Sequence, residues 1–202
     1  MKKKLTGLFW LPLLTLVTVF SRSACADSPP LALLKTNLAS VQQVLADPKL
    51  AGDKQLYQRR KLVRIVLQQL FDFEEMSRRS LGANARRYKD RLGEFTPLFI
   101  EFLEHAYMGT LEANGDAKIQ YVREVNNGDY VQISTKTRLK DGSEYRVDYK
   151  LLSNQAGWRV YDVIVEGISL VNNYRSQFDR ILNKTSFDEL LKELREKKEK
   201  FN

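Results

Sequence analysis

The chain has 202 residues, and 43% of them are hydrophobic, which is enough for one sizeable core or two close-packed subdomains. The 33 basic and 25 acidic residues give a net charge of +8, and the single cysteine is unlike the composition of small secreted folds held by disulfides. The sequence has one histidine and no glycine-rich phosphate loop, HExxH, CxxC or GxSxG motif. We therefore expect neither a metal site nor a cofactor.

The first residues have the features of a secretory signal peptide. Three lysines come first, an apolar run extends from Leu5 to Phe20, and small residues around Ala26 form a cleavage site. We predict a signal peptide over residues 1–26. Its removal takes away four basic residues and the only cysteine, and it leaves 29 basic against 25 acidic residues.

Two alternatives for this segment are weaker. A transmembrane anchor needs about 20 apolar residues, more than this run provides. Lipidation of Cys25 is the second alternative, but Arg22 stands where lipoprotein signals usually have leucine or a similar residue. We predict an exported domain over residues 27–202, located in a bacterial periplasm. Nucleic acid is not expected as a partner, because an exported protein rarely meets it.

The mature chain begins with helices. Leucine and valine recur at helical spacing in residues 31–45 and 56–70, which predicts two amphipathic helices, and Asp53 is expected to cap the second. Between residues 73 and 92 the sequence is polar and rich in arginine. A solvated helical face is one interpretation of that segment, and a docking patch for an acidic partner or anionic lipid headgroups is the other.

A broadly apolar helix follows. Thr96-Pro97 predicts its start, because proline is favoured in the first helical turn. Apolar residues then cover a wide arc as far as Leu111, too wide for a helix that covers only one neighbour. His105 lies on this helix without a nucleophile or metal ligand to pair with, so we assign it no role.

From Ala117 onward the hydrophobic period changes from 3.6 to 2 residues, which indicates strands. Turn signals at residues 127–128, 141–142 and 154–157 separate these runs and predict a meander of four antiparallel strands. The expected buried face of the first strand contains Ile119, Tyr121 and Val125. The fourth strand, residues 158–166, is apolar on both faces, so it is covered on both sides or faces a cavity.

The chain closes with two more helices. Gly167 ends the fourth strand, and apolar residues then recur at four-residue steps from Leu170 to Leu182. Ser186 with Glu189 three residues on is a capping-box spacing that predicts the start of the last helix. The expected fold class is therefore α+β, a twisted antiparallel sheet of about four strands packed with N- and C-terminal helices.

Asp162 and Glu166 lie among the apolar residues of the fourth strand. Two carboxylates in a sheet pocket could act as general acid and base. Alternatively, Asp162 is a buried charge that needs a partner, and Arg175 on the following helix could supply a structural ion pair. We favour the structural ion pair.

The run WRVYDVIVEGISLVNNYRSQF, residues 158–178, resembles the C-terminal signature of the MlaC family, also called the toluene-tolerance family. The order of the other features is similar to that family: a signal peptide, N-terminal helices, a helix that ends in YMGTL, four strands, and a closing helix that begins FDELL. The resemblance covers nearly all of residues 30–195.

The resemblance implies a phospholipid shuttle in the periplasm of a Gram-negative bacterium. It implies a mixed α/β fold related to the NTF2-like cradle, with an apolar lipid cavity, and lipid that is cargo rather than cofactor. The implied partners are a glycerophospholipid, an inner-membrane ABC transporter complex with MCE-domain subunits, and an outer-membrane lipoprotein–porin complex. Such a shuttle maintains the lipid asymmetry of the outer membrane and is not an enzyme.

The surplus apolar surface supplies candidate lipid-binding residues. Each of them could also be ordinary core, because periodicity does not show which side of a residue is empty. The candidates are Leu98, Phe102, Tyr107, Leu111, Tyr121, Val147, Tyr149, Val163, Val165, Ile168, Val171, Tyr174 and Phe178.

Two other functions remain open at this point. A small enzyme on an NTF2-like cradle would use Asp162 or Glu166 as its general base. A protein-docking module would contain no lipid at all.

Overall fold

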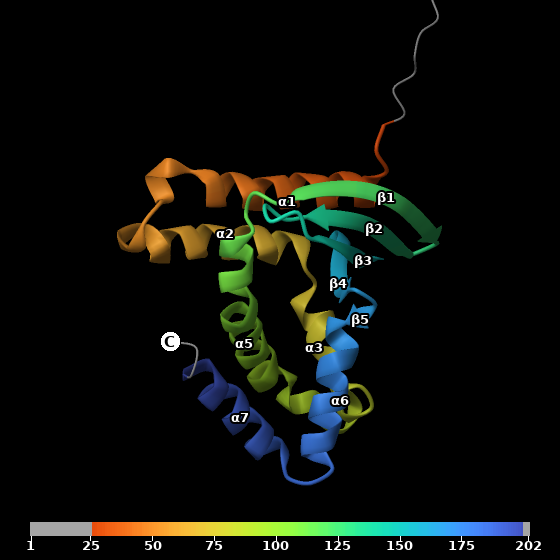
Figure 1. Ribbon diagram of the computed structural model, residues 1–202. Coiled ribbons are helices and arrows are strands. Elements are labelled where there is room, and N and C mark those ends of the chain that lie inside the picture. The colour runs from red at the N-terminus through yellow and green to blue at the C-terminus, as the bar shows by residue number, and fades with distance from the viewer. Residues whose placement is uncertain (1–25, 200–202) are drawn as a thin grey trace, which may run out of the picture.

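The computed structural model describes residues 26–199, so the predicted signal peptide lies outside the described residues except for Ala26. Figure 1 shows two parts, which we call the sheet lobe and the helical lobe. The sheet lobe contains α1 (Pro29–Ala46), α2 (Leu56–Leu70), β1 (Lys118–Asn127), β2 (Tyr130–Arg138), β3 (Glu144–Asn154), β4 (Gly157–Val165) and β5 (Ile168–Ser169). The helical lobe contains α3 (Phe73–Leu81), α4 (Asn84–Arg87), α5 (Leu92–Ala113), α6 (Leu170–Leu182) and α7 (Phe187–Glu199).

The sheet is an antiparallel meander in the order β1-β2-β3-β4-β5, which confirms the predicted class and topology. It has five strands in place of the four predicted. After β4 the chain reverses through Glu166 and Gly167, whose φ angles are 49° and 82°. Two consecutive residues with positive φ form the tight turn that suits a hairpin, so Ile168 and Ser169 pair back onto β4 as a short fifth strand.

Two bulges change which face of the sheet a residue occupies. In β1 the pairing moves from Tyr121 opposite Thr135 to Arg123 opposite Ser134, so Val122 is an extra residue. Val125 then pairs with Gln132 on the face opposite Tyr121, and it is exposed. The prediction that Ile119, Tyr121 and Val125 share one face was therefore wrong for Val125, because a bulge reverses the alternation beyond it.

One face of the sheet is buried under α1 and α2, as the alternation of apolar residues predicts. The buried members of this cluster are Leu34, Leu70, Val131, Ile133, Tyr149, Leu151 and Val160. In β4 the second bulge makes Tyr161 the extra residue between Val160 and Asp162. Tyr161 and Asp162 turn to the other face, towards α3 and α6, so β4 is covered on both sides.

Two of the predicted helix starts were wrong. Asp53 lies in a short 3-10 helix before α2, and α2 begins without a side-chain cap. The apolar helix α5 begins at Leu92 rather than at Thr96, with Pro97 inside it. Proline is tolerated there because only one hydrogen bond, to the carbonyl of Gly93 in the first turn, is lost. The predicted cap of α7 is confirmed, since the amide of Glu189 donates to Ser186 Oγ at 3.2 Å.

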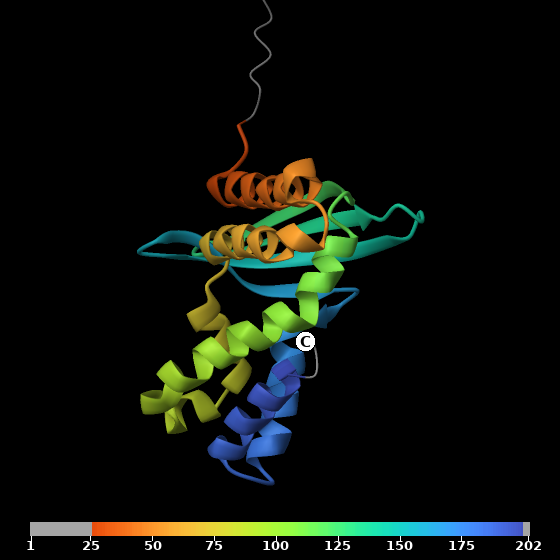
Figure 2. The ribbon, with the colours of Figure 1, turned by 90° about the vertical axis from the view of Figure 1, so that its left-hand side faces the viewer.

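Helix α5 joins the two lobes. Figure 2 shows it running from beside α2 down into the helical lobe. At its C-terminal end Met108 packs with Val41 and Val63 in a small buried cluster. Nearby, Glu112 forms ion pairs with Arg59 and Arg60 of α2 at 3.2 and 2.9 Å. These contacts hold the upper half of α5 against the sheet lobe and leave its lower half in the helical lobe.

Candidate functional site

The core of the helical lobe is rich in aromatic side chains. Phe99, only 1% exposed, lies 5.4 Å from Phe95 and 5.5 Å from Phe178 between ring centroids. The ring of Tyr174 is 5.4 Å from both Phe99 and Phe102, in edge-to-face geometry. Such pairs add about 0.5–1.5 kcal/mol each beyond the burial of their area. The core is therefore a network of rings contributed by α5 and α6.

The structure divides the predicted lipid-binding residues between environments rather than placing them in one wall. The helical-lobe cluster contains Leu98, Phe102, Val171, Tyr174 and Phe178. The sheet-lobe cluster contains Tyr121, Val147, Tyr149 and Val163. Tyr107, Val165 and Ile168 are exposed, and Leu111 is half-buried. Phe71, which is not among the predicted lipid-binding residues, packs against both clusters and links them.

We call the three exposed candidates, Tyr107, Val165 and Ile168, the apolar rim. Val165 and Ile168 pair with each other on the two strands that lead into α6, and they are 44% and 67% exposed. Tyr107 is 38% exposed, and its hydroxyl lies 3.2 Å from that of Tyr174 on α6. Burial, reinforced by this hydrogen bond, raises the pKa of Tyr174, so its hydroxyl is neutral. The rim residues therefore expose large apolar side chains, and Tyr107 among them contacts the aromatic core through Tyr174.

Asp162 has different partners from the one predicted. It is 4% exposed, and it accepts hydrogen bonds from Ser169 Oγ at 2.7 Å and from the backbone N–H of Val171 at 3.1 Å. Ser169 Oγ also accepts from the amide of Asn172, which caps α6. Among the described residues no ion pair joins Asp162 to Arg175. Arg175 instead packs over Gly82, because the start of α6 already satisfies the carboxylate.

The second candidate base, Glu166, also binds backbone. Its carboxylate accepts a hydrogen bond from the amide of Arg146 on the neighbouring strand β3. Its own amide donates to the carbonyl of Arg146 at 3.0 Å. Both bonds stabilise the turn that begins β5. The two carboxylates therefore have structural partners, and the one hydroxyl bonded to Asp162, that of Ser169, is itself engaged in capping α6.

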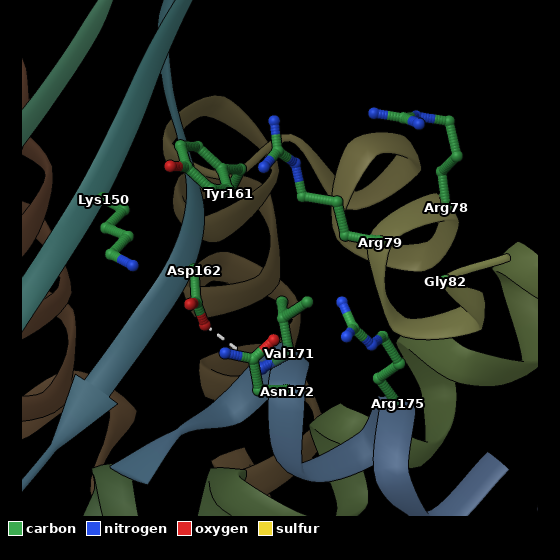
Figure 3. A pocket seen from close by; sticks show the side chains of 9 residues that line it. All are labelled: Arg78, Arg79, Gly82, Lys150, Tyr161, Asp162, Val171, Asn172 and Arg175. Carbon is green, nitrogen blue, oxygen red and sulfur yellow. Dashed lines mark hydrogen bonds between the residues drawn. The ribbon is translucent and has the colours of Figure 1, made fainter. Parts of the chain in front are cut away.

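A polar cavity of about 320 Å³ lies between α3, β4 and α6 (Figure 3). Four of the side chains around it are basic and one is the buried Asp162. The lining residues are Arg78, Arg79, Gly82, Lys150, Tyr161, Asp162, Val171, Asn172 and Arg175. The sequence had indicated a docking patch or solvated face near Arg78 and Arg79, but Lys150 and Arg175 join it only through the fold.

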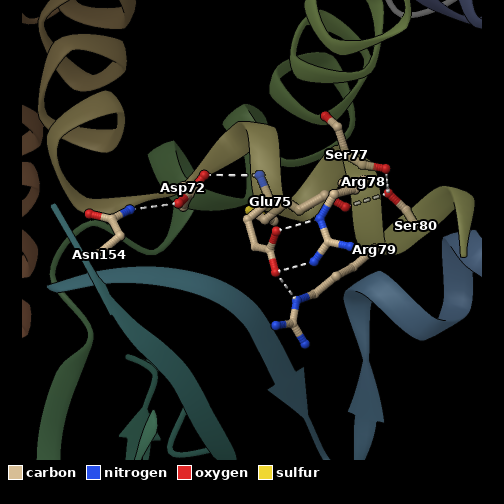
Figure 4. A network of polar contacts seen from close by, with 8 residues as sticks. Asp72, Glu75, Ser77, Arg78, Arg79, Ser80 and Asn154 are labelled. Carbon is tan, nitrogen blue, oxygen red and sulfur yellow. Dashed lines mark hydrogen bonds and ion pairs between the residues drawn. The ribbon is translucent and has the colours of Figure 1, made fainter. Parts of the chain in front are cut away.

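One carboxylate organises the two arginines of α3 (Figure 4). Glu75 accepts hydrogen bonds from Arg78 and Arg79, each at 2.6 Å. The guanidinium of Arg79 also lies 4.1 Å from the ring centre of Tyr161, a cation–π contact. Burial would raise the pKa of Glu75, but the two arginines outweigh burial and lower it. Arg79 is thus held against β4 from two sides.

None of the helices in residues 26–199 is long and apolar enough to cross a membrane. The same residues contain no group of three histidine, cysteine, aspartate or glutamate residues placed to hold a metal ion. His105 contacts the carbonyl oxygen of Glu101 on its own helix at 2.7 Å.

Comparison with known proteins gives one family and one fold. The family model described as MlaC protein matches residues 35–196. No curated protein matches the chain. Among solved structures, the chain is similar to a phospholipid-binding protein from Ralstonia solanacearum, which was solved in complex with a phospholipid. The TM-score is 0.73 and the identity 21%, over 84% of this chain and 97% of that chain, so the likeness shows a shared fold.

Proposed function

Because the chain belongs to the MlaC family, we propose that it is a periplasmic phospholipid carrier. It binds a glycerophospholipid and moves it between the outer and inner membranes, which maintains the lipid asymmetry of the outer membrane. Its proposed partners are an outer-membrane lipoprotein–porin complex and an inner-membrane ABC transporter complex with MCE-domain subunits, as the family resemblance implies. The phospholipid bound by the similar Ralstonia solanacearum protein supports this proposal.

The observation that carries the proposal is the exposure of the apolar rim. Val165 and Ile168 expose large apolar side chains at the start of α6, where a monomer without a ligand gains nothing from them. Tyr107, the third member of the rim, bonds to the buried Tyr174. An acyl chain that covers the rim would remove its exposed apolar side chains from water.

Helices α5 and α6 are the elements most able to separate around acyl chains. They meet through side chains such as Phe99 and Tyr174, whereas the long strands are joined by continuous backbone pairing. Moving a helix exchanges one set of apolar contacts for another. Moving a strand breaks backbone hydrogen bonds, which costs about 1–3 kcal/mol for each buried group left unsatisfied. We therefore place the tails between α5 and α6, below the rim.

Tail burial is sufficient to hold a lipid. Each methylene removed from water contributes about 0.8 kcal/mol, so ten methylenes contribute on the order of 8 kcal/mol before the costs of binding. Burial of the acyl tails requires no polar contact with the headgroup, so phospholipids of several classes can bind at one site. The same reasoning favours a carrier over an enzyme, because Asp162 and Glu166 already hold backbone groups.

Mass spectrometry of organic extracts from the purified protein tests the function. We expect glycerophospholipids to co-purify with the wild type. Ile168→Glu places a carboxylate in the rim at a position that is 67% exposed, so the fold is kept while an apolar ligand is repelled. Tyr57→Glu, at a 76% exposed position on α2, is the matched control and should retain its lipid. Absence of lipid from every preparation would contradict the carrier function, and full lipid in Ile168→Glu would exclude the rim.

A further inference from the structure

The polar cavity between α3, β4 and α6 has more positive than negative charge. Four basic side chains line it, against two carboxylates, Asp162 in its wall and Glu75 behind the arginines of α3. In the part of the chain that the structure describes, the side chains of Lys150 and Arg175 make no hydrogen bond or ion pair. Two cations that face one cavity without an acidic partner are available for an anion.

Asp162 does not neutralise these cations by direct contact. Both of its oxygens accept hydrogen bonds at the start of α6, one from Ser169 and one from the amide of Val171. Lys150 is the direct neighbour of Asp162 across β3 and β4, so both side chains lie on the same face of the sheet. The carboxylate fixes the wall of the cavity and leaves the ammonium of Lys150 for another group.

Arg79 is arranged for binding before any ligand arrives. Its Nε donates to Glu75 at 2.6 Å, and its planar group stacks on Tyr161. Figure 3 shows Arg79 and Arg175 extending from α3 and α6 towards the space beside β4. Gly82 allows Arg175 to lie this close to the end of α3, since a Cβ at position 82 would be 2.8 Å from Arg175 Cδ. A side chain that is already positioned loses less entropy when it binds.

We propose that this cavity binds a phosphate group, supplied either by a phospholipid headgroup or by a small phosphate ester. Arginine and lysine are the side chains that recognise phosphate, arginine through its fork of donors and lysine as a point charge. The surplus of two positive charges is enough to neutralise a phosphate diester, which has one negative charge, or a monoester, which has up to two. A volume of about 320 Å³ is at the lower end of the range for ligand sites, which suits a headgroup rather than two acyl chains.

The cavity is separate from the rim. Its lining is mostly polar, and Val171 is its one aliphatic contributor among the lining residues named above. The inference depends on the proposed function only for the source of the phosphate, because the cavity would bind a phosphate ester whether or not the protein transports lipid.

Isothermal titration calorimetry of the purified, delipidated protein tests the site. The ligands are glycerol 3-phosphate, the short-chain lipid dihexanoyl phosphatidylglycerol, and glycerol as the uncharged control. The test variant combines Lys150→Gln with Arg175→Gln, two side chains that make no hydrogen bond or ion pair among the described residues. Arg180→Gln, an exposed arginine of α6 that does not line the cavity, is the matched control. Circular dichroism confirms that each variant is folded.

We expect the double variant to bind at least one phosphate ligand about tenfold more weakly than the wild type, with Arg180→Gln unchanged and glycerol unbound. Weakening for glycerol 3-phosphate identifies a site that binds small phosphate esters, and weakening for the short-chain lipid alone identifies a headgroup site. If the double variant binds both ligands as tightly as the wild type, or if neither ligand binds, the phosphate site is excluded. If binding of the short-chain lipid does not depend on the charges of Lys150 and Arg175, this inference is overturned and the carrier function still stands.

Discussion

The sheet lobe and the helical lobe are stabilised by different interactions. In the sheet lobe, long antiparallel strands share continuous backbone pairing, and aliphatic residues such as Ile133 and Leu151 fill the space under α1 and α2. In the helical lobe, aromatic side chains such as Phe99 and Phe178 hold helices that are far apart in sequence. This difference indicates that a ligand is accommodated more easily in the helical lobe. Its side-chain packing can rearrange, whereas hydrogen-bonded strands resist separation.

The largest expected effect comes from the aromatic core. Phe99→Ala removes a ring that contacts four others, so we expect a loss of about 3–5 kcal/mol in the free energy of unfolding. Urea denaturation measures the loss, and Leu151→Ala in the sheet lobe, expected to cost about 2–5 kcal/mol, is the control. Hydrogen exchange should accelerate in α5 and α6 more than in β2 and β3. Equal acceleration of hydrogen exchange in both lobes would contradict the view that the two lobes are stabilised by different interactions.

A smaller effect is expected where the lobes are joined. Asp162 lies on β4 but holds the first turn of α6, and the amide of an Asn side chain cannot accept both of its hydrogen bonds. We expect Asp162→Asn to lower the free energy of unfolding by about 1–3 kcal/mol. Thermal and urea denaturation measure this, with the exposed Asp90→Asn as the control. A variant as stable as the wild type would show that the join depends on other contacts.

The smallest effect concerns the Glu75 network. Because its folded pKa is below its ordinary value of 4.5, Glu75 stabilises the fold above pH 4.5, and this contribution is lost as the pH falls through the lower folded pKa. We expect Glu75→Gln to cost about 0.5–1 kcal/mol at neutral pH and nothing in strong acid. Denaturation of both proteins over a pH series measures the difference. A constant difference at every pH would mean that the carboxylate charge has no role.

Local chemistry explains which parts of the fold could be predicted. Pairs such as Asn127-Gly128 favour a turn through the backbone preferences of their own residues, so the strands between them were located correctly. Val122 and Tyr161 have no such signal, because a bulge depends on the partner strand as well as on its own residues. The start of α5 was missed for a related reason, since Pro97 fits inside a helix when the residues before it also continue the helix.

The candidate site was less predictable than the fold. Asp162 was recognised as a buried charge, but the nearby cap at Ser169 was overlooked in favour of the more distant Arg175. A serine before an apolar helix was a visible signal for that cap. No local signal could have joined Lys150 to the arginines of α3, because their proximity depends on how α3 and α6 pack against the sheet.

The bulge at Val122 has a consequence for the protein in a crowded compartment. β1 is an edge strand of the sheet, and its outer side offers unpaired backbone groups to any other extended chain. The extra residue interrupts the regular spacing of those groups, and Arg123 adds a charge beside it. A protein with exposed apolar side chains is at particular risk of self-association. The irregular edge protects it from growing into a continuous intermolecular sheet.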